Sequence, residues 1–170
     1  MKKTILLFAT AITLFACKQS EVKTENAATG SVATSGPDVD LIKKSSTAFA
    51  NGDWATYAST YADTAKSSLN GWPSATDTNA GVRMPVLIEG FKKQRELMDG
   101  NITMGGSIFE VVTMPDGNKY GHLWVEFSWK SKKGVPGKTV LFDSYGINKD
   151  GKISYEWPIF DTKDVAKLGQ

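Results

Sequence analysis

The chain contains one histidine, His122, and one cysteine, Cys17, which limits the chemistry open to it. A single cysteine forms no intrachain disulfide and no thiolate zinc site, and a single histidine excludes histidine-rich catalytic zinc sites. A carboxylate-only calcium or magnesium site stays open as an alternative, although no loop has the spacing for one. The sequence also lacks a serine–histidine–acid arrangement, a phosphate-binding glycine loop and a dinucleotide fingerprint. We therefore expect no metal and no cofactor.

His122 lies in a predicted strand over residues 119–130, in which side chains alternate between two faces. The apolar face is the obvious core and carries Leu123, Val125, Phe127 and Trp129. The other face carries Tyr120, His122, Trp124, Glu126 and Ser128. This arrangement directs His122 and Glu126 to solvent or to a subunit interface. In the alternative interpretation, the mixed polar and aromatic face lines a ligand pocket.

Asp143 lies in a second predicted strand, over residues 138–148, and shares a face with Leu141, Tyr145 and Ile147. If aromatic groups surround this carboxylate, desolvation raises its pKa, and it could transfer a proton near neutral pH. In the alternative interpretation, Asp143 is solvated or pairs with a nearby lysine.

The elements that must position these residues follow from the change in hydrophobic period along the chain. A period of three to four residues predicts helices over 38–50, with Asp38 as N-cap, from the N-cap Asp53 to about 63, and over 85–98. A period of two then predicts strands over 102–114, 119–130, 138–148 and 152–160. Helices followed by an antiparallel meander indicate an α+β domain.

The charge balance argues against a nucleic-acid partner. The chain has 20 basic and 18 acidic side chains, and Lys2 and Lys3 belong to the predicted leader, which leaves 20 − 2 = 18 basic residues in the rest. Proteins that bind nucleic acid usually show a concentrated basic excess.

The N-terminus has the pattern of a secretory signal. Lys2 and Lys3 precede an apolar stretch from Ile5 to Ala16, which is too short to span a bilayer because a spanning helix needs about 20 residues. The sequence Leu14-Phe15-Ala16-Cys17 resembles the lipobox of bacterial lipoproteins. This resemblance implies cleavage before Cys17, lipid on its thiol and attachment to a membrane. Lys18 follows the cysteine, so an outer membrane is favoured over the inner membrane, with the domain facing the periplasm or the cell surface.

Three segments are therefore expected. Residues 1–16 form the signal peptide, residues 17–37 a lipidated, flexible tether, and residues 38–170 the folded domain. The tether is inferred from its Ser, Thr, Ala, Gly, Lys and Glu content, which buries too little apolar surface to offset its ordering entropy.

The folded part resembles the nuclear transport factor 2-like superfamily, close to its SnoaL-like branch. The resemblance covers residues 38–161 and is carried by three stretches: 49–54 (FANGDW), 61–63 (YAD) and 143–153 (DSYGINKDGKI). It implies a cone-shaped fold in which three N-terminal helices pack on a curved antiparallel sheet of about four to six strands. It also implies a pocket between helices and sheet, in which an aspartate at the position of Asp143 acts as general acid or base.

The resemblance leaves the function open between two main hypotheses. The favoured one is a noncatalytic domain that binds a small apolar or amphipathic molecule or another envelope protein. The alternative is an isomerase, hydratase or cyclase that uses Asp143, assisted by His122. A homodimer through the outer face of the sheet is compatible with both. The residues expected to line the pocket are aromatic: Trp54, Tyr57, Trp72, Trp124, Tyr145 and Trp157.

Overall fold

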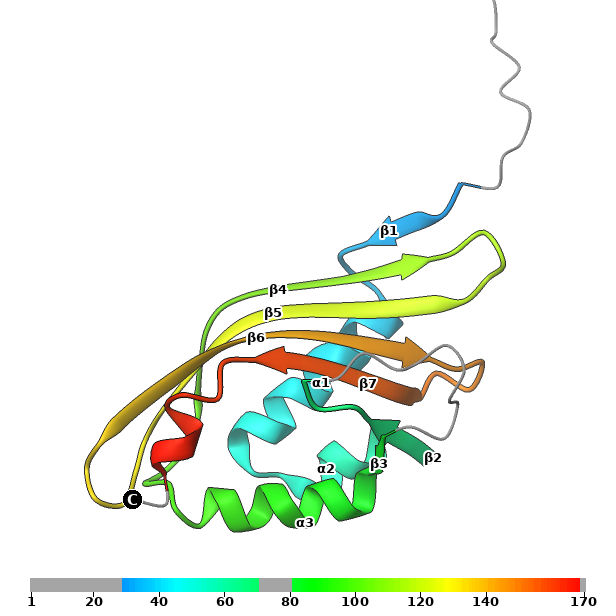
Figure 1. Cartoon of the computed structure of the whole chain (residues 1–170). Helices are drawn as coiled ribbons and strands as arrows, with labels where there is room; N and C mark the ends of the chain where they lie inside the picture. Colours follow the sequence, from blue (N-terminus) through cyan, green and yellow to red (C-terminus); the bar gives the residue numbers. More distant parts are fainter. Residues whose placement is uncertain (1–28, 71–80, 169–170) are drawn as a thin grey trace, which may run out of the picture.

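The computed structural model describes residues 29–70 and 81–168 and shows an α+β architecture, in which helices cover one face of a curved sheet (Figure 1). The sheet has seven strands, in the order β1-β4-β5-β6-β7-β2-β3. All neighbouring strands are antiparallel except β2 and β7, which are parallel. The strands are β1 (Ser31–Ala33), β2 (Tyr61–Ser67), β3 (Val82–Arg83), β4 (Thr103–Thr113), β5 (Lys119–Lys130), β6 (Pro136–Ile147) and β7 (Ile153–Phe160).

The sheet therefore has more strands than the four to six expected from the sequence. The predicted strands correspond to β4, β5, β6 and β7, whose long alternating patterns are visible in the sequence. The missed strands are β1, β2 and β3, which have only three, seven and two residues. Strands as short as β1 and β3 carry no readable alternation, and they form because a neighbouring strand offers backbone hydrogen bonds.

Three α-helices pack against the sheet: α1 (Pro37–Asn51), α2 (Trp54–Ser59) and α3 (Met84–Arg95). A short 3₁₀ helix, η1 (Val165–Lys167), follows the last strand. None of the described helices is long and apolar enough to cross a membrane. The junction of the first two helices is as predicted: Gly52 ends α1 at φ 71°, and the side chain of Asp53 accepts a hydrogen bond from the Thr56 N–H at 3.0 Å.

The start of α1 differs from the prediction that Asp38 is the N-cap. Gly36 occupies the N-cap position and Pro37 begins the helix, where its missing N–H costs nothing. The Asp38 carboxylate instead accepts a hydrogen bond from the Lys119 ammonium at 2.6 Å and so ties α1 to β5.

The second helix is shorter than the prediction, which extended it to about residue 63. It ends at Ser59, and Tyr61 begins β2 beside Ile153 of β7. The four-residue spacing of Tyr57 and Tyr61 fits a helix, but the two rings meet at 5.0 Å between centroids from a helix and a strand. The third helix ends three residues earlier than expected, and Met98 forms an isolated bridge with Ser131.

The folded region also begins earlier than residue 38, inside the segment expected to be a flexible tether. Residues Ser31–Ala33 form β1, which pairs with Val111–Thr113 of β4. The side chains of β1 are exposed, so the strand adds backbone hydrogen bonds and buries little apolar surface. Composition predicts burial of side chains and therefore could not indicate this pairing.

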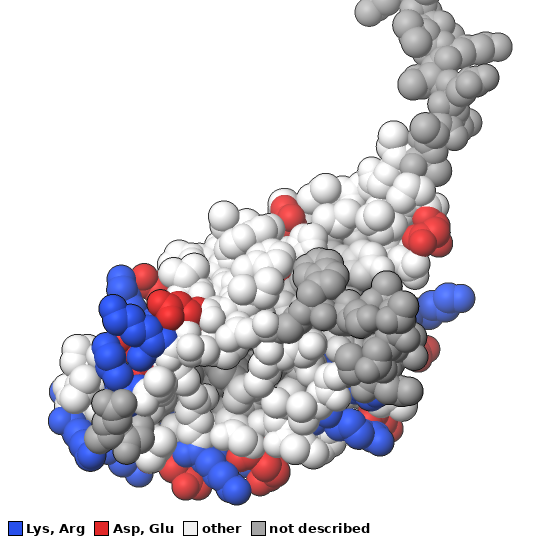
Figure 2. Space-filling model, viewed as in Figure 1, with Lys and Arg blue, Asp and Glu red and all other residues white. Residues whose placement is uncertain are grey.

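The core lies between the helices and the inner face of the sheet. The predicted core face of β5 is buried there, with Leu123 fully inaccessible and Trp129 8% exposed. On the face seen in Figure 2, basic and acidic side chains lie next to one another, so this face carries no large patch of one sign.

Candidate functional site

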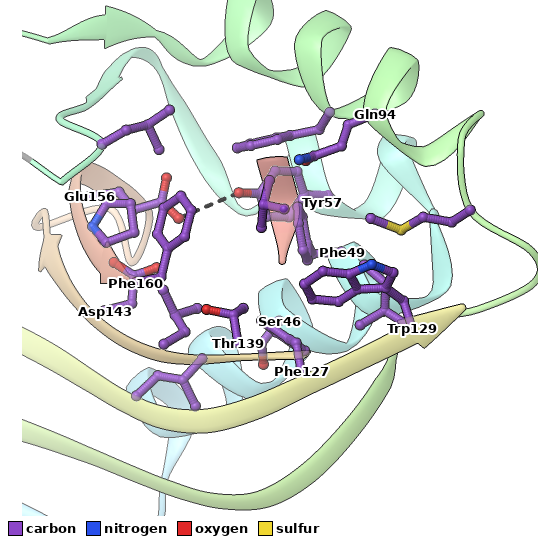
Figure 3. Close-up of a pocket in the computed structure, with 18 of the residues that line it drawn as sticks. Ser46, Phe49, Tyr57, Gln94, Phe127, Trp129, Thr139, Asp143, Glu156 and Phe160 are labelled. Carbon is purple, nitrogen blue, oxygen red and sulfur yellow. Dashed lines mark hydrogen bonds between the residues drawn. The ribbon is translucent and has the colours of Figure 1, made fainter. Parts of the chain in front are cut away.

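A cavity of about 100 Å³ lies between the helices and the inner face of β5, β6 and β7 (Figure 3). Alternation along the strands directs one residue in two toward it, and a buried stripe of each helix closes the other side. Its wall is mostly apolar and aromatic. The lining residues from the helices include Ser46, Phe49, Tyr57, Phe91 and Gln94, and those from the strands include Phe127, Trp129, Leu141, Asp143, Tyr145, Glu156 and Phe160.

Phe49 is the centre of the aromatic wall. Its ring lies 5.6 Å from Tyr57, 5.2 Å from Phe91 and 5.7 Å from Phe127, measured between centroids. These residues come from α1, α2, α3 and β5, so the aromatic contacts join every layer that surrounds the cavity. Ring pairs at such distances add about 0.5–1.5 kcal/mol each beyond their buried area.

Two carboxyl groups lie side by side at one end of the cavity, those of Asp143 on β6 and Glu156 on β7 (Figure 3). Asp143 is 2% exposed and Glu156 5% exposed. The Tyr61 hydroxyl donates to Glu156 Oε1 at 3.0 Å, and the Tyr57 hydroxyl lies 3.4 Å from the same oxygen. Apart from the contact between the two carboxyl groups, Asp143 Oδ1 and Glu156 Oε2 have no hydrogen-bond partner among the described residues.

The electrostatics of this pair differ from those of exposed carboxylates. Burial, reinforced by repulsion from Glu156, raises the pKa of Asp143 well above its ordinary value. Burial also raises the pKa of Glu156, but hydrogen bonds from Asp143, Tyr61 and Tyr57 oppose this rise. The described residues that line the cavity include no lysine, arginine or histidine. The pKa of both carboxyl groups is therefore raised, and the rise is larger for Asp143 because fewer hydrogen bonds oppose it.

The tyrosines of the site remain neutral hydrogen-bond donors. Burial is the largest cause that raises the pKa of Tyr57, Tyr61 and Tyr145 well above the ordinary value, and the neighbouring carboxyl groups raise it further. The site can thus offer a protonated carboxyl, a carboxylate and phenolic hydroxyls at the end of an apolar cavity. Such a set can donate and accept a proton on a bound molecule.

Of the residues predicted from the sequence, Asp143, Tyr57 and Tyr145 line the cavity together. Trp54 packs against the outer side of the aromatic wall, 6.0 Å from Phe49 between centroids, and does not line the cavity. Trp72 lies outside the described residues.

Trp124 and Trp157 lie on the other face of the sheet, which corrects their expected place in the pocket wall. Trp124 is 38% exposed and its ring lies 4.9 Å from that of Phe142. Trp157 lies 4.6 Å from Tyr155. The outward positions of Trp124 and Trp157 follow from alternation, because the preceding residues, Leu123 and Glu156, point inward.

His122 is also on this outer face, and its expected role as an assistant to Asp143 does not fit the geometry. Its Nδ1 lies 3.2 Å from Glu110 Oε1, and its ring contacts Trp124 and Phe142. Asp143 pairs in register with Leu123, the residue after His122, and alternation therefore sends the two side chains to opposite faces. A molecule in the cavity cannot reach both.

Glu156 and Tyr61 are site residues that the sequence-based prediction missed. Tyr61 was assigned to a helix end. Glu156 shares its strand face with Pro158 and Phe160, and a single carboxylate on an otherwise apolar face was the available signal. That signal was obscured by the register shift at the start of the β6–β7 pairing, which moves the alternation of β7 by one residue. Within the described residues, no group of three or more His, Cys, Asp or Glu side chains is placed to hold a metal ion.

Comparison of the sequence finds no matching family model and no matching curated protein. Comparison of the structure finds many similar chains. An NTF2-like protein from Burkholderia xenovorans is 16% identical, with a TM-score of 0.56, and the match covers 81% of this chain and all of that one.

Two further solved structures have the same architecture. IdmH from Streptomyces antibioticus, a candidate polyketide cyclase, is 16% identical over 77% of this chain and 96% of its own, with a TM-score of 0.53. A Mycobacterium tuberculosis protein in complex with estradiol-17β-hemisuccinate is 13% identical over 76% of this chain and 98% of its own, with a TM-score of 0.55. The described domain therefore has the nuclear transport factor 2-like fold.

Proposed function

We propose that this domain binds a small, mostly apolar molecule in its cavity and that Asp143 and Glu156 transfer protons to and from it. The observation that carries the proposal is the contact of two buried carboxyl groups at the end of an apolar cavity, without a cationic residue among the described lining residues. Buried carboxyl groups with raised pKa values beside a cavity are typical of acid–base sites.

The division of roles follows from the hydrogen bonds. Asp143 holds the proton and acts as the general acid. Glu156, stabilised as a carboxylate by the hydroxyls of Tyr57 and Tyr61, receives a proton in turn. Isomerisation, hydration and cyclisation all need such paired proton transfers. The similarity to a candidate polyketide cyclase supports this reaction class.

Noncatalytic binding is the second candidate function, and the mostly apolar wall of the cavity favours it. In that case the carboxyl pair only orients the bound molecule. The two functions share the ligand and differ in whether protons are exchanged with it, which makes them separable by experiment.

The test begins with native mass spectrometry of the full chain purified from its own cell envelope. Extra mass that is lost on denaturation identifies the bound molecule. That molecule is then incubated with the protein in D₂O, and deuterium incorporation is followed by mass spectrometry. We expect the wild type to incorporate deuterium into carbon-bound positions and Asp143→Asn to lose at least about 100-fold in rate.

Asp150→Asn, on an exposed turn, is the matched control and should retain the wild-type rate. Binding by wild type and Asp143→Asn without any exchange would overturn the catalytic part and leave the noncatalytic function.

We also propose that the protein is a lipoprotein, tethered through lipid on Cys17 to the outer membrane. The lone cysteine after Leu14-Phe15-Ala16 supports this proposal, and these residues lie outside the described part of the chain. Several acyl chains hold a protein to a bilayer firmly because each buried methylene contributes about 0.8 kcal/mol.

A homodimer through the outer face of the sheet is the third part of the proposal. Ile108, Trp124, Phe142 and Ile159 are directly opposite one another on adjacent strands and form one apolar row across β4, β5, β6 and β7. Ile108 is 61% exposed and Ile159 48% exposed. An exposed apolar row of this kind favours a self-complementary contact related by a two-fold axis.

A further inference from the structure

We infer that the molecule bound in the cavity is the size of a single six-membered ring and carries one uncharged oxygen, either a hydroxyl or a carbonyl. The cavity therefore selects against carboxylates and against fused rings. This inference rests on the proposed function, because it specifies the ligand class of that same cavity. Three features support it: the cavity volume, the charge of the wall and the position of the polar groups.

The volume limits the ligand to about one ring. The cavity measures about 100 Å³, whereas an engineered cavity of about 150 Å³ holds benzene and drug-sized pockets span about 300–1,000 Å³. The rings of Phe49, Phe91 and Phe127 are in contact with one another through Phe49 and occupy the space that a larger ligand needs. The cavity is half-open, so a fused ring system would extend out of the enclosed space unless one of the wall residues is made smaller.

The charge of the wall excludes anions. The described lining residues contain two carboxyl groups and no cation, so a bound carboxylate would meet Glu156 without a counter-ion. Two like charges in a buried site of low dielectric repel strongly, and the ligand would also lose its hydration.

The position of the polar groups favours an uncharged oxygen over a cationic amine. Glu156 Oε1 already accepts a hydrogen bond from Tyr61 at 3.0 Å and lies 3.4 Å from the Tyr57 hydroxyl, so its charge already has partners. Asp143 is 2% exposed, lines the cavity, and its Oδ1 has no hydrogen-bond partner among the described residues apart from the contact with Glu156. The group left to be matched is therefore Asp143 Oδ1, to which a ligand hydroxyl can donate and from which a hydroxyl or carbonyl oxygen can accept when this atom carries the proton.

The carboxyl groups of the cavity lie at one end, and the other polar lining side chains, Ser46, Gln94 and Thr139, are neutral. Figure 3 shows Asp143 and Glu156 at one end and Trp129 at the other. A ligand with one oxygen on a single ring can place that oxygen against the carboxyl pair and its ring against the aromatic wall.

The test compares three probes, benzyl alcohol, benzoate and 2-naphthalenemethanol, on the full chain. Binding is followed by NMR of ¹³C-methyl methionine, in which Met98 lines the cavity and the exposed Met114 is an internal control. We expect benzyl alcohol to shift the Met98 signal and to bind at least about 100-fold more tightly than benzoate. We expect naphthalenemethanol to bind at least about 10-fold more weakly than benzyl alcohol.

Variants test each cause separately. Phe160→Ala enlarges the cavity and should improve naphthalenemethanol binding at least about 10-fold. Leu141→Ala enlarges the same cavity and replaces Phe160→Ala if the latter does not fold. Ile159→Ala, on the outer face of the same strand as Phe160, should leave binding unchanged. Glu156→Gln removes the buried charge and should reduce the discrimination against benzoate at least about 10-fold.

Two results would overturn the inference and leave the proposed function in place: equal binding of naphthalenemethanol and benzyl alcohol by the wild type, or equal binding of benzoate and benzyl alcohol. Failure of every probe to shift Met98 would also overturn it. The proposed function fails separately, when the molecule recovered from the envelope undergoes no proton exchange or when no molecule is recovered.

Discussion

Asp143 and Glu156 are the central residues of the candidate site because their side chains are buried in contact, which disfavours a negative charge on both. Each would be an ordinary surface carboxylate if solvated. Together, at 2% and 5% exposure and beside an apolar cavity, their pKa values are raised by burial, and that of Asp143 is raised further by repulsion from Glu156. Burial of these carboxyl groups makes the free energy of unfolding depend on pH, and this dependence can be measured.

Stability should decrease as the pH rises, in a manner that depends on Asp143. The pKa of Asp143 is raised in the folded state by burial and by Glu156, so between its unfolded and folded pKa values the folded state binds more protons than the unfolded state. Its contribution to stability is fully present below the unfolded pKa and is lost as the pH rises through the folded pKa. Asp143→Asn cannot titrate, so its stability should vary less with pH across this window.

The measurement is urea unfolding at a series of pH values above 4, for wild type and both variants. Asp150→Asn, a change at an exposed turn carboxylate, should follow the wild-type curve. Parallel curves for wild type and Asp143→Asn would contradict the assignment of the proton to Asp143.

The packing of α1 against β5 sets the spacing between the helices and the sheet, and the cavity lies in this space. Ile42 of α1 is fully buried and lies directly over Gly121 of β5. A Cβ at residue 121 would lie 2.1 Å from Ile42 Cδ1, far inside van der Waals contact. Glycine is therefore required here for close approach of the helix and not for an unusual backbone angle.

Gly121→Ala should lower the free energy of unfolding by about 1–3 kcal/mol, because overpacking forces the helix or the Ile42 side chain to move. The double variant Gly121→Ala with Ile42→Ala should be less destabilised than the sum of the single changes, since the alanine at 121 fills part of the space left by Ile42. Chemical denaturation of the four proteins gives the coupling energy.

Gly106→Ala is the control for this cycle. Gly106 lies in β4, and nothing would lie within 4 Å of an added Cβ. Its substitution should change stability by less than about 0.5 kcal/mol. If the stability changes of Gly121→Ala and Ile42→Ala are strictly additive, the contact between Ile42 and residue 121 does not contribute to the packing of α1 on β5.

At the scale of the whole molecule, the outer face of the sheet is the surface on which assembly is expected. If the apolar row through Trp124 and Phe142 forms a two-fold contact, Phe142→Lys should convert a dimer to a monomer, because each interface would then bury two unpaired ammonium groups. Sedimentation velocity of wild type and variant measures this change.

Val86→Lys is the matched control, since Val86 is an apolar residue of α3 that is 64% exposed. This variant should sediment like the wild type. A wild type that is monomeric at high protein concentration would exclude the dimer.

The proposed membrane anchor predicts a second property of the whole molecule. Cys17→Ser should abolish lipid attachment and cleavage before residue 17, because the serine hydroxyl does not replace the thiol that receives the lipid. Mass spectrometry of the mature N-terminus and membrane flotation in a Gram-negative host measure both effects. Ser20→Ala should remain lipidated and float with the outer membrane. A wild type that is soluble after export would exclude the anchor.

Much of the fold could be predicted from the sequence where the evidence was local. The junction at Gly52 and Asp53, the start of α3 near Pro85 and the long strands 119–130 and 138–147 depend on neighbours within a few residues. Alternation along those strands placed Asp143 and Tyr145 on one face of their strand and His122 opposite Leu123 in its own, and the pairing of the two strands then put His122 and Asp143 on opposite faces of the sheet.

The rest was decided by contacts between segments far apart in the chain. Tyr61 follows a helical pattern, yet β7 supplies the backbone partners that make it a strand. β1 exists because β4 has a free edge.

The sequence by itself therefore determined the α+β class and which residues share a face within each long strand, because periodicity is a local property. Only the tertiary structure decided that Glu156 meets Asp143, that Tyr57 and Tyr61 converge on Glu156, and that Trp124 and Trp157 lie outside the cavity. Those relations depend on register and on the β6–β7 shift, which are set by backbone pairing across the sheet and leave no periodic signal in the chain.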